Sequence, residues 1–245
     1  MPRRLGQHFL HNPSILDRIA DAACPSPEPL LIEIGAGPGG LTRSLSTRAQ
    51  RVVAIELDPV LAENLQIQFS NVEVLQADVL ELDMSQWGPA VIAGNLPYYI
   101  TSPIIEKVLN LGPLLKRAVF LVQKEVAQRL AAQPGSRDYG YLTVAIQFTC
   151  RVELLFTVKP AAFRPPPKVD SAVVRLTPHT TAPSLDRASF LDFVSLCFTH
   201  KRKTLRNNLA PRYPVINDLP EARLRAEQLS LPAFTSLFRT IVEVS

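Results

Sequence analysis

The sequence predicts an α/β protein, in which a mainly parallel β-sheet with helices on both faces is followed by a small, all-helical domain. Apolar runs typical of buried strands alternate with helix-compatible segments, as in parallel sheets covered on both sides. A glycine-rich turn directly follows the first run, and the last part of the chain has helical spacing only. The strand-like runs are Leu30 to Ile34, Val52 to Ile55, Val72 to Leu75, Ala90 to Ala93 and Ala118 to Val122.

The first run ends in the glycine-rich turn Glu33 to Gly40, and a helical pattern begins at Leu41. Glycine permits a tight turn and a close approach of the backbone to a ligand. Gly35, Gly37 and Gly40 formally match the dinucleotide-binding fingerprint. The pattern predicts a cofactor that contains a nucleoside. Nicotinamide dinucleotides and S-adenosylmethionine are both compatible with it.

Acidic residues end the next two runs. Glu56 stands where a carboxylate can accept hydrogen bonds from ribose hydroxyls. Asp78 ends the third run, where an acid can accept a hydrogen bond from the exocyclic amine of a bound adenine. A helix is predicted to begin at Pro59, because proline suits the first helical turn and because Leu61 and Leu65 share a face.

The fourth run leads into Asn95-Leu96-Pro97-Tyr98, which places a polar amide, a rigid turn and an aromatic ring at one strand end. Such a group suits a pocket that hydrogen-bonds the edge of a flat, amine-bearing ring and stacks on its face. Asn and Pro are also common turn residues, so an ordinary turn is the alternative. Together with the preceding strand ends, however, the pattern resembles an adenine-N6 methyltransferase far more than a dehydrogenase.

The second half of the chain is predicted to close the sheet and then to become helical. Tyr141 to Cys150 and Ala172 to Leu176 are rich in β-formers, which indicates an antiparallel pair at the sheet edge. Pro178 to Pro183 is typical of a linker and separates a domain of residues 1–178 from one of residues 184–245. In the second domain, helical spacing relates Phe190, Phe193, Val194 and Cys197, and also Leu231, Phe234, Leu237, Phe238 and Ile241.

Seven motifs follow one another along nearly the whole chain, and their order and spacing are highly specific. They are Gly6 to Leu10, the glycine turn, Asn95 to Tyr98, Gln123 to Val126, Tyr139-Gly140, Phe163 to Val173 and Arg202 to Asn207. With them the chain resembles the ribosomal RNA adenine N6,N6-dimethyltransferases. The Phe163 to Val173 segment looks more like the small-subunit rRNA enzymes than their erythromycin-resistance relatives, which modify large-subunit rRNA. Bacterial members often carry Asn in place of His8.

The resemblance implies a Rossmann-like, class I methyltransferase fold that uses S-adenosylmethionine. It implies dimethylation of the N6 amines of two adjacent adenosines in the 3′-terminal hairpin loop of small-subunit rRNA, as part of ribosome biogenesis. The partner would be this rRNA or the immature small ribosomal subunit, bound by a monomer. A large-subunit rRNA or DNA methyltransferase, and a non-catalytic RNA-binding or transcription factor on the same scaffold, remain as alternatives.

The predicted site combines the strand ends with residues carried over from the family. The cofactor-binding residues are Gln7, His8, Leu10, Gly35, Gly37, Glu56, Leu57, Asp78, Val79 and Asn95, and the catalytic residues are Asn95, Leu96, Pro97, Tyr98 and Phe163. The segment that carries Gln7, His8 and Leu10 is expected to fold over the cofactor as a lid. The Phe163 ring, held by the prolines after it, is expected to sandwich a base against Tyr98.

Charge and composition favour a soluble protein with a polyanionic partner. The net charge is +4, and the densest basic cluster contains Lys201, Arg202, Lys203 and Arg206, with Arg206 expected one helical turn beyond Arg202. RNA phosphates are the expected ligands of this cluster, and a solvated helix face is the alternative. Three isolated cysteines predict no metal site, no apolar run is long enough to span a bilayer, and the first residues lack the apolar core of a secretory signal. These features predict a cytoplasmic protein.

Overall fold

The computed structural model describes residues 7–180 and 185–243. Gly6 of the N-terminal motif and residues 181–183 of the expected linker therefore lie outside the described residues. The chain divides into two compact units, of which the first comprises Met1–Ala127 with Arg151–Pro178 and the second Gln128–Cys150 with His179–Ser245.

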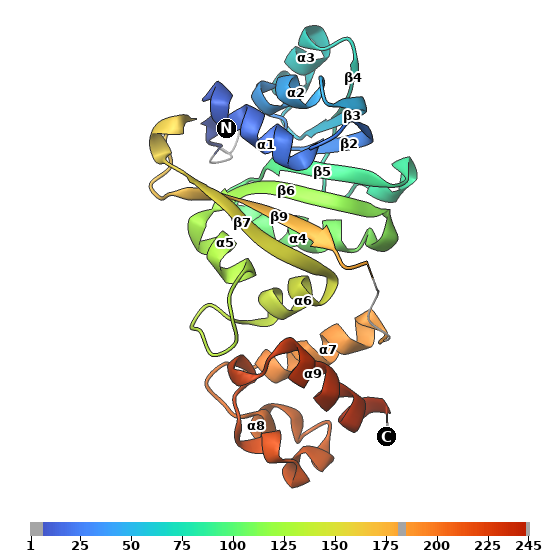
Figure 1. The fold of residues 1–245 in the computed structure, drawn as a ribbon, viewed down its shortest axis with the longest axis vertical. Coiled ribbons are helices and arrows are strands. Elements are labelled where there is room, and N and C mark those ends of the chain that lie inside the picture. Colours follow the sequence, from blue (N-terminus) through green and yellow to red (C-terminus); the bar gives the residue numbers. More distant parts are fainter. Residues whose placement is uncertain (1–6, 181–184, 244–245) are drawn as a thin grey trace. The chain divides into compact units, whose positions relative to one another are not determined.

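The first unit is built on a seven-stranded sheet of order β4-β3-β2-β5-β6-β9-β7 (Figure 1). The strands are β2 (Glu28–Ile34), β3 (Ala49–Glu56), β4 (Val72–Gln76), β5 (Ala90–Asn95), β6 (Leu115–Gln123), β7 (Cys150–Val158) and β9 (Ser171–Pro178). Strands β2 to β6 pair in parallel, and β9 pairs antiparallel with β6. All five strand-like runs of the sequence are thereby confirmed as strands.

The strand order reverses between β2 and β5. The chain runs outward from β2 through β3 to β4, and then returns to place β5 on the other side of β2, with Glu33 opposite Ala93. The two backbones lie so close that a Cβ added to Gly94 would be 2.4 Å from the Ile34 carbonyl oxygen. In open α/β sheets, a ligand crevice forms beyond the carboxyl ends of the strands at such a reversal.

Helices cover both faces of the sheet. Leu16 and Ile19 of α1 belong to one hydrophobic cluster with Leu31 and Val91 of the strands. Ile92 alternates with Val91 and so points to the opposite face, where α4 packs. The helices are α1 (Pro13–Ala23), α2 (Gly40–Leu45), α3 (Pro59–Gln68), α4 (Thr101–Leu109) and α5 (Lys124–Leu130), with the single turns η1 (Met84–Trp87), η2 (Tyr98–Ile100), η3 (Gly112–Leu114) and η4 (Pro160–Ala162).

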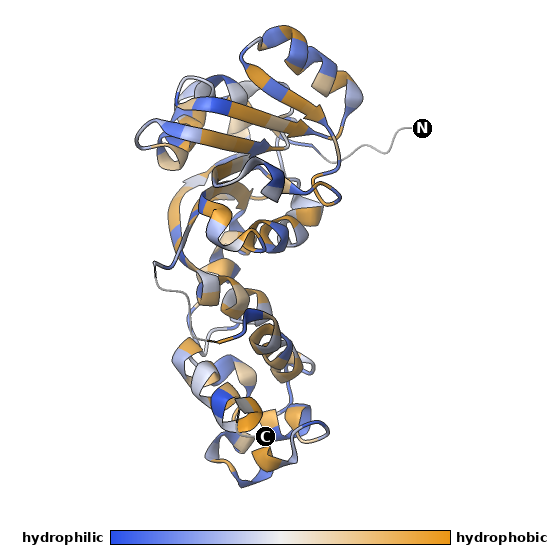
Figure 2. Cartoon of the chain, turned by 90° about the vertical axis from the view of Figure 1, so that its right-hand side faces the viewer, coloured by the Kyte–Doolittle hydropathy of each residue, from blue (hydrophilic) through white to orange (hydrophobic). Residues whose placement is uncertain are grey.

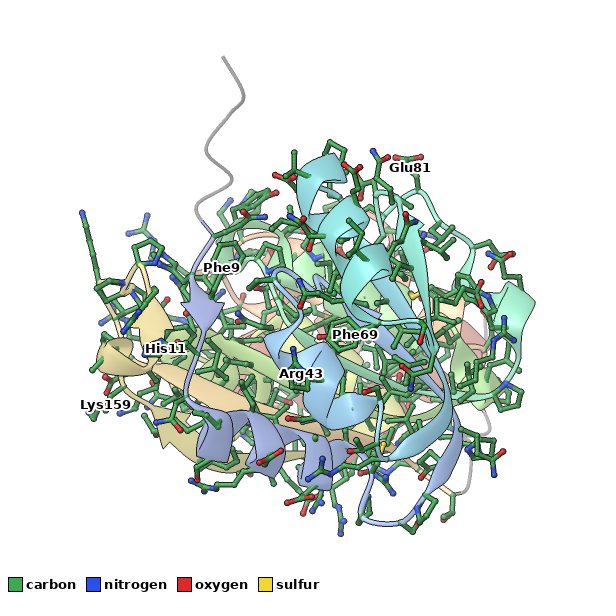
Figure 3. All side chains as sticks on the ribbon, turned by 90° about the horizontal axis from the view of Figure 1, so that it is seen from above. Phe9, His11, Arg43, Phe69, Glu81 and Lys159 are labelled. Carbon is green, nitrogen blue, oxygen red and sulfur yellow. The ribbon has the colours of Figure 1, made fainter. Side chains whose placement is uncertain are left out.

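Local signals set the ends of these helices. The predicted start of α3 at Pro59 is confirmed, and the Asp58 side chain caps it by accepting from the amides of Val60 and Leu61. Gly39 precedes α2 with φ +86°, and a Cβ there would lie 2.6 Å from the Phe69 ring. Arg43 lies over that ring, with its Cζ 5.4 Å from the centroid (Figure 3). The glycine turn and α2 can therefore pack on α3 only because residue 39 has no side chain.

The predicted strand at Tyr141 to Cys150 is wrong. Tyr141–Thr149 forms helix α6, and only Cys150 belongs to a strand, β7. Four consecutive residues of α6, from Thr143 to Ile146, are buried. A helix buried on most sides has an apolar run that cannot be distinguished from a buried strand by periodicity. Strand β9 pairs antiparallel with β6, and β7 lies beside β9 as the edge strand of the sheet.

The boundary between the units also differs from the expected one, because residues 128–150 pack with the C-terminal helices. Phe148 stacks on Phe190 with 4.3 Å between ring centroids, and the Tyr139 ring lies 6.4 Å from that of Phe198. Besides α6, the second unit contains α7 (Arg187–Phe198), α8 (Leu205–Leu209), α9 (Leu231–Phe238), the π-helical turn Arg239–Glu243 and the short turns η5 (Pro214–Asp218), η6 (Pro220–Arg223) and η7 (Ala226–Gln228). These helices mix hydrophobic and hydrophilic residues, and their apolar sides form the core of the unit (Figure 2).

Cys24, Cys150 and Cys197 are free and buried. Among the described residues, no group of His, Cys, Asp and Glu is arranged to hold a metal ion. No helix in the described part of the chain has the length and apolar character needed to cross a bilayer.

Glu33 is a carboxyl group inside the core. Its side chain is 1% exposed, and Oε2 has no hydrogen-bond partner among the described residues. Burial, reinforced by the nearby Glu56 carboxylate, raises the pKa of the Glu33 carboxyl from 4.5 to about 8. The folded protein therefore holds this proton more tightly than the unfolded chain does.

A carboxyl whose pKa is raised on folding contributes stability that is fully present below its unfolded pKa and is lost as the pH rises through its folded pKa. We expect this contribution to be lost between about pH 4.5 and pH 8. Glu33→Gln cannot ionise, so its Tm should exceed the wild-type value by roughly 3 °C or more at pH 8 and by less at pH 5. Thermal denaturation without ligand measures both, and Glu63→Gln, on the exposed side of α3, is the control. Parallel pH profiles for Glu33→Gln and the wild type would contradict this account.

Candidate active site

A pocket of about 760 Å³, counted with its open mouth, lies at the carboxyl ends of β2, β3, β4 and β5. Most of the predicted site residues line it, namely Gln7, His8, Gly35, Gly37, Glu56, Leu57, Asp78, Val79, Asn95, Leu96, Pro97 and Tyr98. Phe9, Ile34, Ile55, Ala77, Tyr99, Ile100 and Ile104 complete the lining.

Glu56 connects the glycine turn to the start of α3. Its Oε2 accepts from the Gly37 amide at 2.8 Å, and its Oε1 accepts from the Asp58 amide at 2.9 Å. The residue is almost fully buried, but it still borders the pocket. A carboxylate offers about four lone-pair sites, so acceptor capacity remains on both oxygens. The two amides thus fix an anionic acceptor at the pocket wall.

Asp78 provides a second acceptor at the end of β4. Its Oδ1 accepts from the Leu80 amide at 2.8 Å, which holds the carboxyl in place. Val79 beside it is buried, whereas Leu57 on the neighbouring loop is half exposed. The two acids therefore stand between apolar side chains, an arrangement that suits a ligand with a polar edge and an apolar face.

Asn95 ends β5 with its amide group oriented by the N-terminal segment. Its Nδ2 donates to the backbone oxygen of His8 at 2.9 Å. A carbonyl can only accept, so this contact determines which end of the amide carries the nitrogen. The side-chain oxygen of Asn95 is consequently the atom left to accept from a ligand.

The turn after Asn95 presents backbone and aromatic groups to the pocket. The Pro97 oxygen already accepts from the Ile100 amide and the Thr101 hydroxyl. The Leu96 oxygen is therefore the better candidate for a second ligand acceptor. The Tyr98 ring is partly buried, and burial raises the pKa of its hydroxyl although the bond to Ser171 opposes the shift. The phenol is thus neutral near pH 7.

The predicted N-terminal segment reaches the pocket through Gln7, His8 and Phe9. A two-residue strand, β1 (Phe9–Leu10), pairs antiparallel with β8 (Phe163–Arg164) and fixes it there. Leu10 itself is buried in the hydrophobic core next to α1. Its side chain lines a small neighbouring cavity and not the main pocket.

Phe163, which was predicted to contact the target base, does not line the pocket. Its side chain is 2% exposed, packs in the same core cluster as Leu10 and is absent from the pocket lining. The β1–β8 pairing places Phe163 directly opposite Leu10, which explains this burial. The structure therefore does not bring Phe163 and Tyr98 together at the pocket, and the stacking role of Phe163 stays a prediction. Phe163 instead packs in the core with Leu10 of the N-terminal segment.

The basic cluster lies in the second unit, in the turn between α7 and α8. Lys201, Arg202 and Lys203 are exposed, and Arg206 is exposed on α8. Helix α7 ends at Phe198, so Arg202 and Arg206 are not one helical turn apart as predicted. The Lys201 ammonium donates to the Arg137 backbone oxygen at 2.6 Å, which leaves the other three side chains of the cluster as the better ligands for an anion.

Besides the aliphatic residues of the lining, two aromatic residues and one hydroxyl group of the site are missing from the sequence-based set. Phe9 and Tyr99 line the pocket, and Tyr99 is 60% exposed beside Tyr98. Ser171 lies outside the lining but bonds to the Tyr98 hydroxyl at 2.6 Å. Phe9 directly follows His8 and Tyr99 directly follows Tyr98, so the sequence could have indicated both aromatic residues. Nothing local indicated the role of Ser171.

Comparison with known proteins identifies the family. Residues 2–223 match the family model described as "Ribosomal RNA adenine dimethylase". The chain is 41% identical over 98% of its length to a "Ribosomal RNA small subunit methyltransferase A" of Chlorobium chlorochromatii, covering 93% of that protein. It is also 41% identical over 93% of its length to the enzyme of that name from Geobacillus thermodenitrificans, covering 80% of it.

Solved structures show the same architecture. A dimethyladenosine transferase from Plasmodium falciparum superimposes with a TM-score of 0.82 at 28% identity, over 95% of this chain and 97% of that one. The 23S rRNA methyltransferase ErmE has a TM-score of 0.71 at 32% identity, over 95% and 99% of the two chains. The fold is therefore that of the class I methyltransferases, and the chain belongs to the ribosomal RNA adenine dimethylase family.

Proposed function

We propose that this protein transfers methyl groups from S-adenosylmethionine to the N6 amines of two adjacent adenosines in the 3′-terminal hairpin loop of small-subunit rRNA. The observation that carries the proposal is the orientation of Asn95, whose amide nitrogen is bonded to His8 and whose oxygen is left at the pocket. An acceptor in that place suits an amine nucleophile. Family membership supplies the adenine and the rRNA.

The described residues fit the proposed cofactor. Glu56 offers an oriented anionic acceptor for ribose hydroxyls, and Asp78 offers one for the adenine amine. A Cβ added to Gly35 would lie 3.4 Å from the Asn95 backbone oxygen, so the glycine leaves room between these two strand ends. When bound, S-adenosylmethionine supplies an electrophilic methyl group.

The residues of the chain contribute orientation to the reaction. Adenine N6 is a poor nucleophile because its lone pair is delocalised into the ring. The Asn95 side-chain oxygen and the Leu96 backbone oxygen can each accept one amine hydrogen, which favours the pyramidal nitrogen from which the lone pair attacks. Neither acceptor has to be a strong base, since the amine loses a proton readily once it is methylated. Positioning therefore provides most of the acceleration.

Small-subunit rRNA is favoured over the alternatives. The chain is 41% identical to a relative named for the small subunit and 32% identical to ErmE, which is named for 23S rRNA. A non-catalytic role is disfavoured because Glu56, Asp78 and Asn95 all line one pocket. Bases in a hairpin loop are partly unstacked already, so presenting one to the pocket costs less than extruding it from a duplex. The immature small subunit is the proposed partner.

Incubating undermethylated small subunits with the protein and labelled cofactor, followed by mapping of N6-methyl marks, tests the function directly. Two adjacent dimethylated adenosines near the 3′ end are expected. Asn95→Ala should lower the rate of single-turnover transfer by about 10²–10³, as for other lost preorganised partners. Both ligands are held saturating, which removes binding defects from the comparison. Marks on large-subunit rRNA alone, or a near-normal rate for Asn95→Ala, would refute the proposal or its mechanism respectively.

Glu56→Ala should weaken S-adenosylmethionine binding strongly, since a charge-assisted hydrogen bond contributes roughly 1.5–3 kcal/mol. Glu56 also holds the Gly37 amide, so Glu56→Gln, which keeps an acceptor oxygen, should lose less than Glu56→Ala. Calorimetry with S-adenosylmethionine and with NAD measures these affinities, and Asp78→Ala should also bind the former more weakly. Tight binding of NAD, or unchanged affinity for S-adenosylmethionine in both alanine variants, would rule out the cofactor assignment.

Replacing Arg202 and Lys203 together by glutamine should reduce RNA affinity and flatten the plot of log affinity against log salt by about 0.7–0.9 per lost phosphate contact. Arg51→Gln with Arg151→Gln removes the same charge from side chains paired with Glu73 and Glu153, and serves as the control. Filter binding at several salt concentrations measures the slopes. If both double variants have the wild-type slope, the cluster is a solvated face.

A further inference from the structure

The Tyr98 ring is held by a contact at its hydroxyl end. The Tyr98 hydroxyl and the Ser171 hydroxyl lie 2.6 Å apart and form a hydrogen bond. Ser171 is fully buried and begins strand β9, where it pairs in register with Gln123 of β6. A partner fixed in the sheet by backbone hydrogen bonds moves little, so this contact fixes the far end of the Tyr98 side chain.

His8 makes a second contact with the same ring. The imidazole of His8 is tilted by 31° relative to Tyr98, with 5.6 Å between the centroids. Its Nδ1 lies 2.8 Å from the Pro165 backbone oxygen, and because a carbonyl can only accept, Nδ1 carries the proton. The β1–β8 pairing continues directly into both residues, from Phe9 to His8 and from Arg164 to Pro165. The His8 ring is thus anchored independently of Tyr98.

We propose that Ser171 and His8 are positioning residues, which hold the Tyr98 ring in one orientation as the surface on which the target adenine stacks. This inference rests on the proposed function. Tyr98 lies in a single turn after the sheet, and a turn alone does not fix the side-chain torsions of its aromatic residue. A ring that is already oriented keeps the adenine amine at the Asn95 oxygen for a larger share of the time, which increases the rate of the chemical step.

The Ser171 contact can be isolated by a double-mutant cycle. Ser171→Ala and Tyr98→Phe remove the two ends of one hydrogen bond while the aromatic ring is kept. We expect each to lower single-turnover transfer by about tenfold at saturating ligands, and the double variant to be no slower than the slower single variant. Affinity for S-adenosylmethionine should remain within about twofold in Ser171→Ala, whose side chain lies outside the pocket lining. Ser171→Cys provides a second test if the alanine variant folds poorly.

A matched pair of variants separates the two contacts of His8. In His8→Asn the side-chain nitrogen can take the place of Nδ1 toward Pro165, but the ring is lost. In His8→Phe the ring is kept and the hydrogen bond is lost. A hairpin RNA with 2-aminopurine at the target position reports stacking by fluorescence quenching without any reaction. We expect quenching to be weaker in His8→Asn and in Ser171→Ala, and to be intermediate in His8→Phe, whose ring has lost its anchor to Pro165.

The controls distinguish this inference from the proposed function. If the wild-type protein places no methyl groups on small-subunit rRNA, the proposed function fails. If the wild type is active and Tyr98→Leu loses activity and quenching, while Ser171→Ala and His8→Asn retain wild-type rates and quenching, the proposed function stands and the positioning role is overturned. Additive rate losses in the Ser171–Tyr98 cycle would equally overturn it, because they would show that the two hydroxyls act separately.

Discussion

The site depends on one constraint, the close parallel pairing of β2 with β5. These strands are far apart in the sequence, and only the reversal of strand order makes them neighbours. Gly94 allows an approach that any side chain would prevent, since a Cβ there would meet the Ile34 oxygen. The glycine turn after β2 and the Asn95 turn after β5 therefore open into the same crevice, and β3 and β4 add their acidic strand ends beside them.

Within that crevice, polar side chains are oriented by hydrogen bonds to backbone groups that do not use their full hydrogen-bonding capacity. Two backbone amides bind the Glu56 carboxylate, and the His8 carbonyl binds the Asn95 amide nitrogen. In both cases hydrogen-bonding capacity remains toward the pocket. Groups arranged in this way need little reorganisation when a ligand enters, which is the physical basis of preorganised binding and catalysis.

The N-terminal segment and the proline-rich loop support the site together. Their pairing buries Leu10 and Phe163 in the core, so two residues expected to contact ligands contribute to packing. His8, two residues before Leu10, lines the pocket, and its ring binds the backbone oxygen of Pro165, two residues after Phe163. A short motif of this kind thus contributes residues to both the core and the site.

The sequence by itself determined the elements that local physics specifies. Apolar runs predicted the five strands, Pro59 predicted the start of α3, and the residues that end the strands predicted most of the pocket. Only the tertiary structure decided that residues 141–149 form a helix of the second unit, that Phe163 is buried, and that Ser171 and His8 hold Tyr98. These features depend on contacts between residues far apart along the chain, as in the 73-residue separation of Tyr98 and Ser171. Periodicity and spacing report only which face of an element is apolar, and not which distant element covers it.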